Sequence, residues 1–206
     1  MAKQERAVRT RGSLIRAAAE IFDREGFAVA SLAMISTQAG VSSGALHFHF
    51  ASKAALADAV EGAALERLRN IAGANTRESA GRLQCVVDVT HGLARGLRGD
   101  VVLRAGFGLC SDPARATPGD LREHWRGWVQ ETLAEAEKAG ELRPGVGPEG
   151  AVIAVVAATV GFEALGSRDE TWLAPRTVAR FWELLLPTLA VADRLETLDA
   201  EGPVDA

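Results

Sequence analysis

Apolar residues recur at spacings of three and four through nearly every segment of this chain, and that period is the strongest constraint on its fold. The segment 9–25 shows the pattern most clearly. Its apolar stripe consists of Leu14, Ala17, Ala18, Ile21 and Phe22. Alternating runs bounded by hairpin turns, which indicate β-strands, are scarce. The sequence therefore predicts an all-α protein.

The predicted helices fall into two groups. The first group lies at about 9–25, 32–38, 44–49 and 53–73, and the second at about 77–97, 100–110, 119–139, 148–166 and 174–193. A serine suited to an N-cap precedes three of the early helices: Ser31, Ser42 or Ser43, and Ser52. A change in composition at 73–81 separates the groups. We therefore expect one domain at 1–53, a connecting helix at 53–73 and a second domain at 74–206.

The composition fits a globular protein and excludes several other classes. The chain has 206 residues, 48% of them hydrophobic and 24% charged, which is enough to bury a core. We expect no apolar run that approaches the ~18 residues of a membrane span, and no signal peptide. Cys85 and Cys110 fit small buried side chains in a reducing cytoplasm. The acidic tail after Leu198 is expected to be disordered.

The net charge of −4 is unevenly distributed along the chain. Residues 1–53 contain 7 Lys and Arg against 4 Asp and Glu, a balance of +3. The remaining residues contain 16 basic and 23 acidic side chains, a balance of −7. Such an asymmetry indicates that the N-terminal part meets a polyanion, which the net charge alone would not suggest.

Residues 31–49 have the layout of a helix-turn-helix, with two short helices joined by a turn that contains glycine. Ala39 would let the two helices approach closely, Gly40 would permit the turn, and Val41 would fill the space beneath it. In a DNA reader, the exposed face of the second helix enters a major groove. On these residues alone, a helical hairpin within an ordinary bundle remains an alternative.

The surrounding residues resemble the TetR family of bacterial repressors over residues 7–65. The run GALHFHFASKAALADAV follows AAAEIFDREGF at a fixed distance, and the family carries a similar aromatic patch followed by Ser-Lys. The resemblance implies a homodimer. It also implies an N-terminal three-helix DNA-binding unit with a helix-turn-helix and a C-terminal helical bundle that binds ligand and dimerises.

Further segments resemble the γ-butyrolactone autoregulator receptors of actinomycetes. They are the opening MAKQERAVRTR, VLRAG at 102–106, the HW pair at 124–125, AEKAGELRPGV at 136–146 and WELLLP at 182–187. This resemblance implies a TetR-type repressor that releases DNA when it binds a butyrolactone or butenolide signal.

Phosphate contacts need cations or helix N-termini directed at DNA. Arg6, Arg9 and Arg11 could form a basic arm, and Ser31 leaves the N–H groups of its helix available to a phosphate. A cation at the start of a helix opposes the helix dipole, so a structural role is not expected for Lys53. A phosphate contact would remove that conflict, and a solvated lysine is the alternative.

Base contacts should come from Ser42, Ser43, Gly44 and His47, with Ala45 against a thymine methyl group. Receptors of this kind usually read Thr-Lys-Gly-Ala-Leu-Tyr where this chain reads Ser-Ser-Gly-Ala-Leu-His. We therefore expect a different operator preference or a weaker affinity. Phe48 and Phe50 are interpreted as packing residues. His47 and His49 diverge on a helix, so no metal site and no cofactor are expected.

The candidate ligand-binding residues are Trp125, Trp128, Val89, Leu93, Phe107, Thr159, Phe162 and Glu163. Trp125 matches the lone tryptophan that stacks over the ligand in the receptor family, and a core tryptophan is the alternative. Thr159 and Glu163 are polar residues on an otherwise apolar helix, and each needs a partner if it is buried. For Glu163 that partner is either the ligand or Arg104.

The last two predicted helices should form a four-helix dimer interface with their twofold mates, because their apolar surface exceeds that of a monomer's surface helix. Trp172 and Trp182 are interpreted as packing or dimer contacts, and Pro187 should kink the last helix. Nucleophile motifs, phosphate loops and metal-ligand spacings are absent from the sequence, so an enzyme is not expected.

The sequence thus predicts a cytoplasmic, nucleoid-associated repressor, released from a pseudo-palindromic operator by a γ-butyrolactone or butenolide. A ligand held between Trp125 and the helix at 148–166 would shift the connecting helix. One alternative is a TetR-type sensor of an antibiotic or another hydrophobic small molecule, as in a diverged pseudo-receptor. Another is a helical interaction module that has lost DNA binding.

Overall fold

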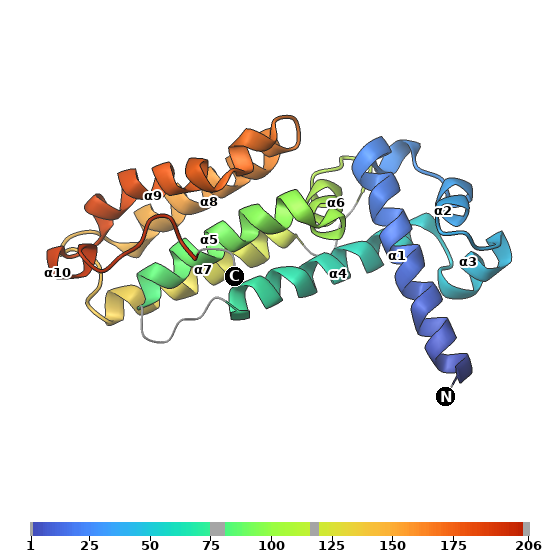
Figure 1. Cartoon of the computed structure of the whole chain (residues 1–206), viewed down its shortest axis with the longest axis horizontal. Helices are drawn as coiled ribbons and strands as arrows, with labels where there is room; N and C mark the ends of the chain where they lie inside the picture. The colour runs from blue at the N-terminus through green and yellow to red at the C-terminus, as the bar shows by residue number, and fades with distance from the viewer. Residues whose placement is uncertain (1, 75–80, 116–119, 204–206) are drawn as a thin grey trace. The chain divides into compact units, whose positions relative to one another are not determined.

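The computed structural model describes residues 2–74, 81–115 and 120–203 (Figure 1). Its helices are α1 (Ala2–Val29), α2 (Leu32–Gln38), α3 (Ser43–His49), α4 (Lys53–Ala74), α5 (Arg82–Gly99), α6 (Val101–Cys110), α7 (Leu121–Lys138), α8 (Pro148–Gly166), α9 (Pro175–Leu189) and α10 (Ala192–Leu195), with a 3₁₀ turn η1 (Glu170–Leu173) between α8 and α9. Over these residues the only β-structure is an isolated bridge between Leu142 and Ala190. The all-α prediction is confirmed.

Serine caps fix the starts of three helices near the N-terminus. Ser31 accepts the N–H of Met34 at 3.2 Å, Ser42 that of Ala45 at 3.2 Å, and Ser52 that of Ala55 at 3.1 Å. Each bond satisfies a donor that the helix itself cannot pair. The predicted starts of these helices are therefore correct to within one residue.

The bounds of three predicted helices differ from those in the structure. α1 begins at Ala2 instead of residue 9; Gly26, with φ 76°, breaks the helix where the prediction ended it, and one further turn carries α1 on to Val29. α5 begins at Arg82, after Gly81 at φ 87°, instead of at residue 77. α9 ends at Leu189 instead of residue 193, and Pro187 lies inside it. Most of the composition change at 73–81 lies outside the described residues.

The described chain divides into two compact units. Unit 1 comprises residues 1–67 and 100–121, and unit 2 comprises residues 68–99 and 122–206. α6 thus belongs with the helix-turn-helix, whereas we expected it in the C-terminal domain. The reason is that α6 packs on α1 and α4 inside unit 1. The functional domains at 1–53 and 74–206 stay a prediction.

The core of unit 1 joins α1 to α2, α3, α4 and α6. Its fully buried side chains include Leu14, Ile35, Leu46 and Leu56. Gly106 of α6 lies directly against Ala64 of α4, so closely that a Cβ atom would clash. A glycine at that position therefore allows the two helix backbones to approach.

Unit 2 is built around α5, which packs against α8, α9 and η1. The buried carboxylate of Glu141 accepts the N–H groups of Arg82 and Leu83 at 3.0 and 2.8 Å. Glu141 lies 59 residues after Arg82, yet it caps α5 in the way a local acidic side chain would.

α8 is long and apolar enough to cross a membrane by length and composition. The expectation that no run approaches the length of a span is therefore wrong. About a third of the residues in its most apolar stretch are buried inside the chain. Core helices of soluble proteins can be equally long and apolar. The apolarity of α8 is thus weak support for a membrane segment.

The tail is ordered up to Pro203, so the expectation of disorder after Leu198 is wrong for these residues. Gln84 exchanges two hydrogen bonds with the backbone of Asp199, at 2.8 and 3.0 Å. His91, two turns further along the same face of α5, donates its Nε2–H to the carbonyl of Ala200 at 2.9 Å. Gly202 lies against the ring of His91, where a Cβ would come within 2.6 Å.

Docking of the tail should depend on pH through His91. Burial lowers the pKa of His91, and the positive charge of Arg95 lowers it further. The hydrogen bond to Ala200 and the carboxylates of Asp88 and Asp199 act in the opposite direction. His91 therefore binds a proton more readily in the unfolded chain than in the folded chain. The free energy of unfolding should fall as the pH drops below 6.5.

The loss should be at most about 1.4 kcal/mol per pH unit in the free energy of unfolding by urea. His91→Gln, which keeps a donor and cannot become charged, should remove this part of the pH dependence. An identical pH profile in His91→Gln and the wild-type chain would contradict the assignment.

Candidate DNA-binding and ligand-binding sites

The helix-turn-helix forms as the sequence predicts. Gly40 takes φ 65°, and the turn closes through a hydrogen bond from the N–H of Val41 to the carbonyl of Ser36 at 3.0 Å. Leu46 of α3 and Ile35 of α2 are fully buried in the core of unit 1. These inward side chains fix which face of α3 is left outside.

The outer face of α3 carries the residues predicted to read bases. Ser42, Ser43, Gly44 and His47 are all exposed, and Ala45 is half-buried. Phe48 lies on the same face and is 81% exposed, so its interpretation as a packing residue is wrong. Phe50 is buried, as expected for a packing residue.

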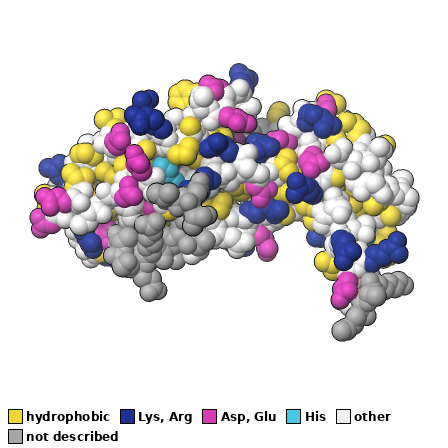
Figure 2. Space-filling view, in the orientation of Figure 1, with side chains coloured by type: hydrophobic (Ala, Val, Ile, Leu, Met, Phe, Trp, Pro, Cys, Tyr) yellow, Lys and Arg dark blue, Asp and Glu magenta, His cyan; other side chains and the backbone are white. Residues whose placement is uncertain are grey.

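Basic residues gather on α1 at its N-terminal end, where Figure 2 shows a group of Lys and Arg side chains. Arg6 and Arg9 are exposed, and they line an open groove between α1 and the turn at Ala39 and Val41. Arg11 is exposed as well, with its guanidinium 5.2 Å from the centre of the Phe50 ring. α1 therefore presents cations beside the helix-turn-helix.

Lys53 has a structural role that we did not expect. Its ammonium donates to the carbonyls of Phe27 at 2.7 Å, Ala28 at 3.3 Å and Ala30 at 2.8 Å. It also lies 4.5 Å from the centre of the Phe27 ring. The cation is thus placed at the carbonyl end of α1, which outweighs its unfavourable place at the start of α4.

In unit 2, Trp125 is buried and satisfies its own N–H. Nε1 donates to Thr159 Oγ1 at 2.7 Å, and Thr159 in turn donates to the carbonyl of Val155 at 2.9 Å. The rings of Trp125 and Trp128 stack with centroids 5.3 Å apart. The sequence correctly placed these two tryptophans on one side of α7.

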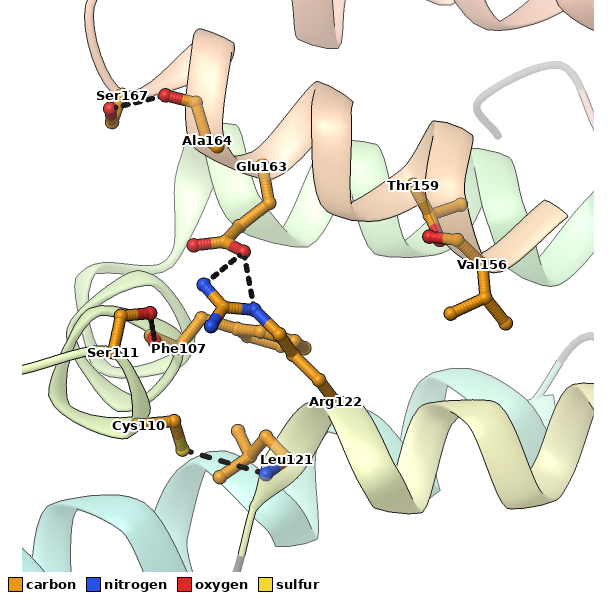
Figure 3. A network of polar contacts seen from close by, with 10 residues as sticks. All are labelled: Phe107, Cys110, Ser111, Leu121, Arg122, Val156, Thr159, Glu163, Ala164 and Ser167. Atoms are coloured by element: carbon orange, nitrogen blue, oxygen red, sulfur yellow. Dashed lines mark hydrogen bonds and ion pairs between the residues drawn. The ribbon is translucent and has the colours of Figure 1, made fainter. Parts of the chain in front are cut away.

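Glu163 pairs with Arg122, so Arg104, one of the two partners considered for it, is not its partner (Figure 3). Arg122 donates from Nη2 and Nε to one carboxylate oxygen at 2.7 and 3.0 Å. Arg104 instead pairs with Asp23 in unit 1, at 3.0 Å. Glu163 is 13% exposed, and the ion pair joins α7 to α8.

The remaining candidate residues are apolar and buried. Val89 and Leu93 lie on α5, and Phe162 of α8 meets Phe181 of α9 edge to face at 5.8 Å. Phe107 is buried in α6 and belongs to unit 1. Five of the eight candidates for ligand binding are thus brought onto two helices of unit 2, α7 and α8.

Trp182 is a candidate that the sequence did not single out. It is fully buried in α9, and its Nε1–H has no acceptor within the described part of the chain. A buried donor without a partner is uncommon and marks a place where an acceptor can be gained. Its position in the apolar stripe of α9 indicated only packing. Among the described residues, clusters of metal-binding side chains are absent.

Comparison with known proteins bears on both sites. Residues 14–60, which include the helix-turn-helix, match the model for bacterial regulatory proteins of the tetR family. The A-factor receptor protein of Streptomyces griseus is 32% identical over 209 aligned residues, covering all of this chain and 72% of the relative.

Solved structures agree with these sequence matches. A γ-butyrolactone receptor described as ArpA-like is similar with a TM-score of 0.82 and 28% identity, over 95% of this chain and 96% of that one. CprB from Streptomyces coelicolor, solved in complex with its biological operator sequence, gives a TM-score of 0.76 and 29% identity, over 93% of each chain.

The match of the helix-turn-helix and the relative that aligns along the entire chain lead to one conclusion. The chain belongs to the TetR family of bacterial regulatory proteins.

Proposed function

We propose that this chain is a homodimeric repressor that leaves its operator when a small hydrophobic signal of the γ-butyrolactone or butenolide type binds unit 2. The observation that carries the proposal is the exposed outer face of α3 on a helix-turn-helix with both helices capped. The chain belongs to a family of bacterial regulatory proteins, so the proposed role is non-catalytic, and we expect the protein to act at its DNA in the cytoplasm.

DNA binding is supported by the distribution of small polar groups and cations. Ser43, Gly44 and His47 would meet base edges, and Ala45 or the exposed Phe48 a thymine methyl group. Arg6 and Arg9 would hold phosphates beside the turn. We leave Lys53 out of the contact set, because its ammonium already bonds to three carbonyls.

Ligand binding is supported by the chemistry of unit 2. Trp125 and Trp182 are both fully buried, and Trp182 offers an N–H that lacks an acceptor. A lactone or ketone carbonyl would supply that acceptor. Trp125 would act through the face of its ring, because its own N–H already binds Thr159.

Dimerisation is supported by apolar surface on α8 and α9, where Figure 2 shows hydrophobic side chains exposed. Ile153 is 70% exposed and Leu184 is 78% exposed. Large apolar side chains at such exposure favour association with a second copy, and TetR regulators form dimers through closed twofold contacts.

One observation favours a diverged operator or signal. Ser43 and His47 stand where receptors of this kind usually carry Lys and Tyr. The alternative function is a TetR-type sensor of an antibiotic or another hydrophobic molecule, and the ligand titration described below distinguishes the two.

Binding to DNA should be steeply dependent on salt. The operator is selected from random duplexes with the full-length dimer, and affinity is measured by fluorescence anisotropy over a series of salt concentrations. Arg9→Ala removes one phosphate contact per protomer, so the slope of log K against log salt should fall by roughly 2 per dimer. Arg24→Ala, an exposed arginine paired with Glu25 at the other end of α1, should leave the slope unchanged. Failure of the wild-type chain to select any duplex would refute the function.

The apolar face of α9 should hold the dimer together. Leu184→Glu places a charge in that face and should shift the sedimentation coefficient from dimer to monomer at micromolar concentration. Val29→Glu, at an equally exposed apolar position of unit 1, should remain dimeric. A dimer that survives Leu184→Glu with unchanged affinity would place the interface elsewhere.

The N–H of Trp182 should contribute to ligand binding. Trp182→Phe keeps an aromatic ring and removes the donor, so γ-butyrolactone affinity measured by calorimetry should fall about 5- to 10-fold. Trp172→Phe, at an exposed tryptophan of η1, should bind as the wild type does. If antibiotics bind and neither γ-butyrolactones nor butenolides do, the alternative signal class is correct.

A further inference from the structure

The last helical turn of α1 leads directly into the helix-turn-helix and defines a short connector, residues 26–31. It begins at Gly26, whose φ of 76° breaks the helix, and it ends at Ser31, the N-cap of α2. Any displacement of the connector must therefore move the first residue of α2. Because α2 packs on α3, the recognition helix would follow.

The connector is held from a distant part of the chain. The backbone N–H of Phe27 donates to Oδ2 of Asp112, 85 residues later, at 3.1 Å. Asp112 lies in a tight turn after α6, residues 111–115, and its other carboxylate oxygen accepts the N–H of Ala114 at 2.9 Å. One carboxylate thus ties this turn to the connector.

Arg115 fastens the same turn to α4. Its side chain is only 4% exposed and donates to Glu61 at 2.7 Å and to Asp58 at 2.9 Å. Its guanidinium also lies 5.1 Å from the centre of the Phe27 ring. The turn therefore contacts α4 and the connector at once.

The ion pair of Arg115 and Glu61 is incompletely satisfied. Arg115 Nε and Glu61 Oε1 are buried with no partner among the described residues, and burial raises the pKa of the Glu61 carboxyl, which Arg115 opposes. Because a buried pair with an unpaired donor and an unpaired acceptor recovers only part of its desolvation cost, it adds little net stability to the contact between the turn and α4.

The turn is also linked to the helix that carries Trp125. α7 begins at Leu121, whose N–H lies 3.5 Å from Sγ of Cys110 at the end of α6 (Figure 3). Arg122 and Trp125 follow one and four residues later on the same helix. A shift of α7 would thus reach the turn through the end of α6.

We propose that the turn at 111–115 couples signal binding to DNA release by pulling the connector through the bond from Phe27 to Asp112. This inference rests on the proposed function, and it assigns Asp112 and Arg115 as positioning residues that touch neither DNA nor ligand. The route enters the helix-turn-helix through the end of α1, in addition to any movement of α4.

The test compares matched aspartates in the full-length dimer. Asp112→Ala removes the link to the connector, and Asp23→Ala removes a different link between α1 and α6, the ion pair with Arg104, upstream of Gly26. Operator affinity is measured by anisotropy with and without a γ-butyrolactone, and lactone affinity by calorimetry.

In the wild type, the lactone should weaken operator binding by a factor within the ~5- to 150-fold range typical of allosteric coupling. Asp112→Ala should keep both separate affinities within about 3-fold while its coupling factor falls at least 5-fold, and Asp23→Ala should keep the wild-type factor. The double variant Glu61→Leu/Arg115→Met, which replaces the buried pair by apolar groups, should behave like Asp112→Ala.

A second arm needs no signalling molecule. Coupling is reciprocal, so operator binding must change amide hydrogen exchange in peptides that cover 111–115, and Asp112→Ala must abolish that change. Unchanged exchange in the wild type, or full coupling in Asp112→Ala, overturns the proposal and leaves the proposed function standing. A wild-type chain that binds no operator overturns both.

Discussion

The arrangement of unit 1 depends on how the end of α1 is held. Gly26 breaks the helix in a conformation that side chains disfavour, and the three carbonyls that follow receive the ammonium of Lys53. Asp112 holds the same segment from its amide side. Because Lys53 binds its carbonyls and Asp112 binds one of its amides, the segment is held in one orientation. That orientation sets the positions of α2 and α3.

The two units combine features that a ligand-responsive regulator requires. In unit 1, α3 is fixed by Leu46 on its inner face and leaves small polar groups outside. In unit 2, Trp125 and Trp182 are fully buried, and α8 and α9 carry the exposed apolar side chains Ile153 and Leu184. The charge balance is +3 over residues 1–53, which carry the helix-turn-helix, and −7 over the rest of the chain, so the excess of cations lies on the segment that would approach phosphate.

Local sequence signals predicted local structure well, and long-range pairings escaped them. The serine caps, the glycine turn and the shared side of Trp125 and Trp128 all follow from spacings within one helical turn. The bonds of Lys53, the cap of α5 by Glu141 and the docked tail join residues 23 to 115 positions apart. Such pairings depend on tertiary packing, which periodicity does not encode, and for the same reason Arg122 was not among the partners considered for Glu163.

The central claim is that DNA binding and signal binding oppose each other in one dimer. The most direct measurement is the dissociation constant for the selected operator at fixed salt, with and without a saturating γ-butyrolactone. The predicted result is tight, salt-sensitive binding that weakens at least about 5-fold when the lactone is present. An operator affinity that the lactone leaves unchanged, although calorimetry shows that the lactone binds, would contradict the claim.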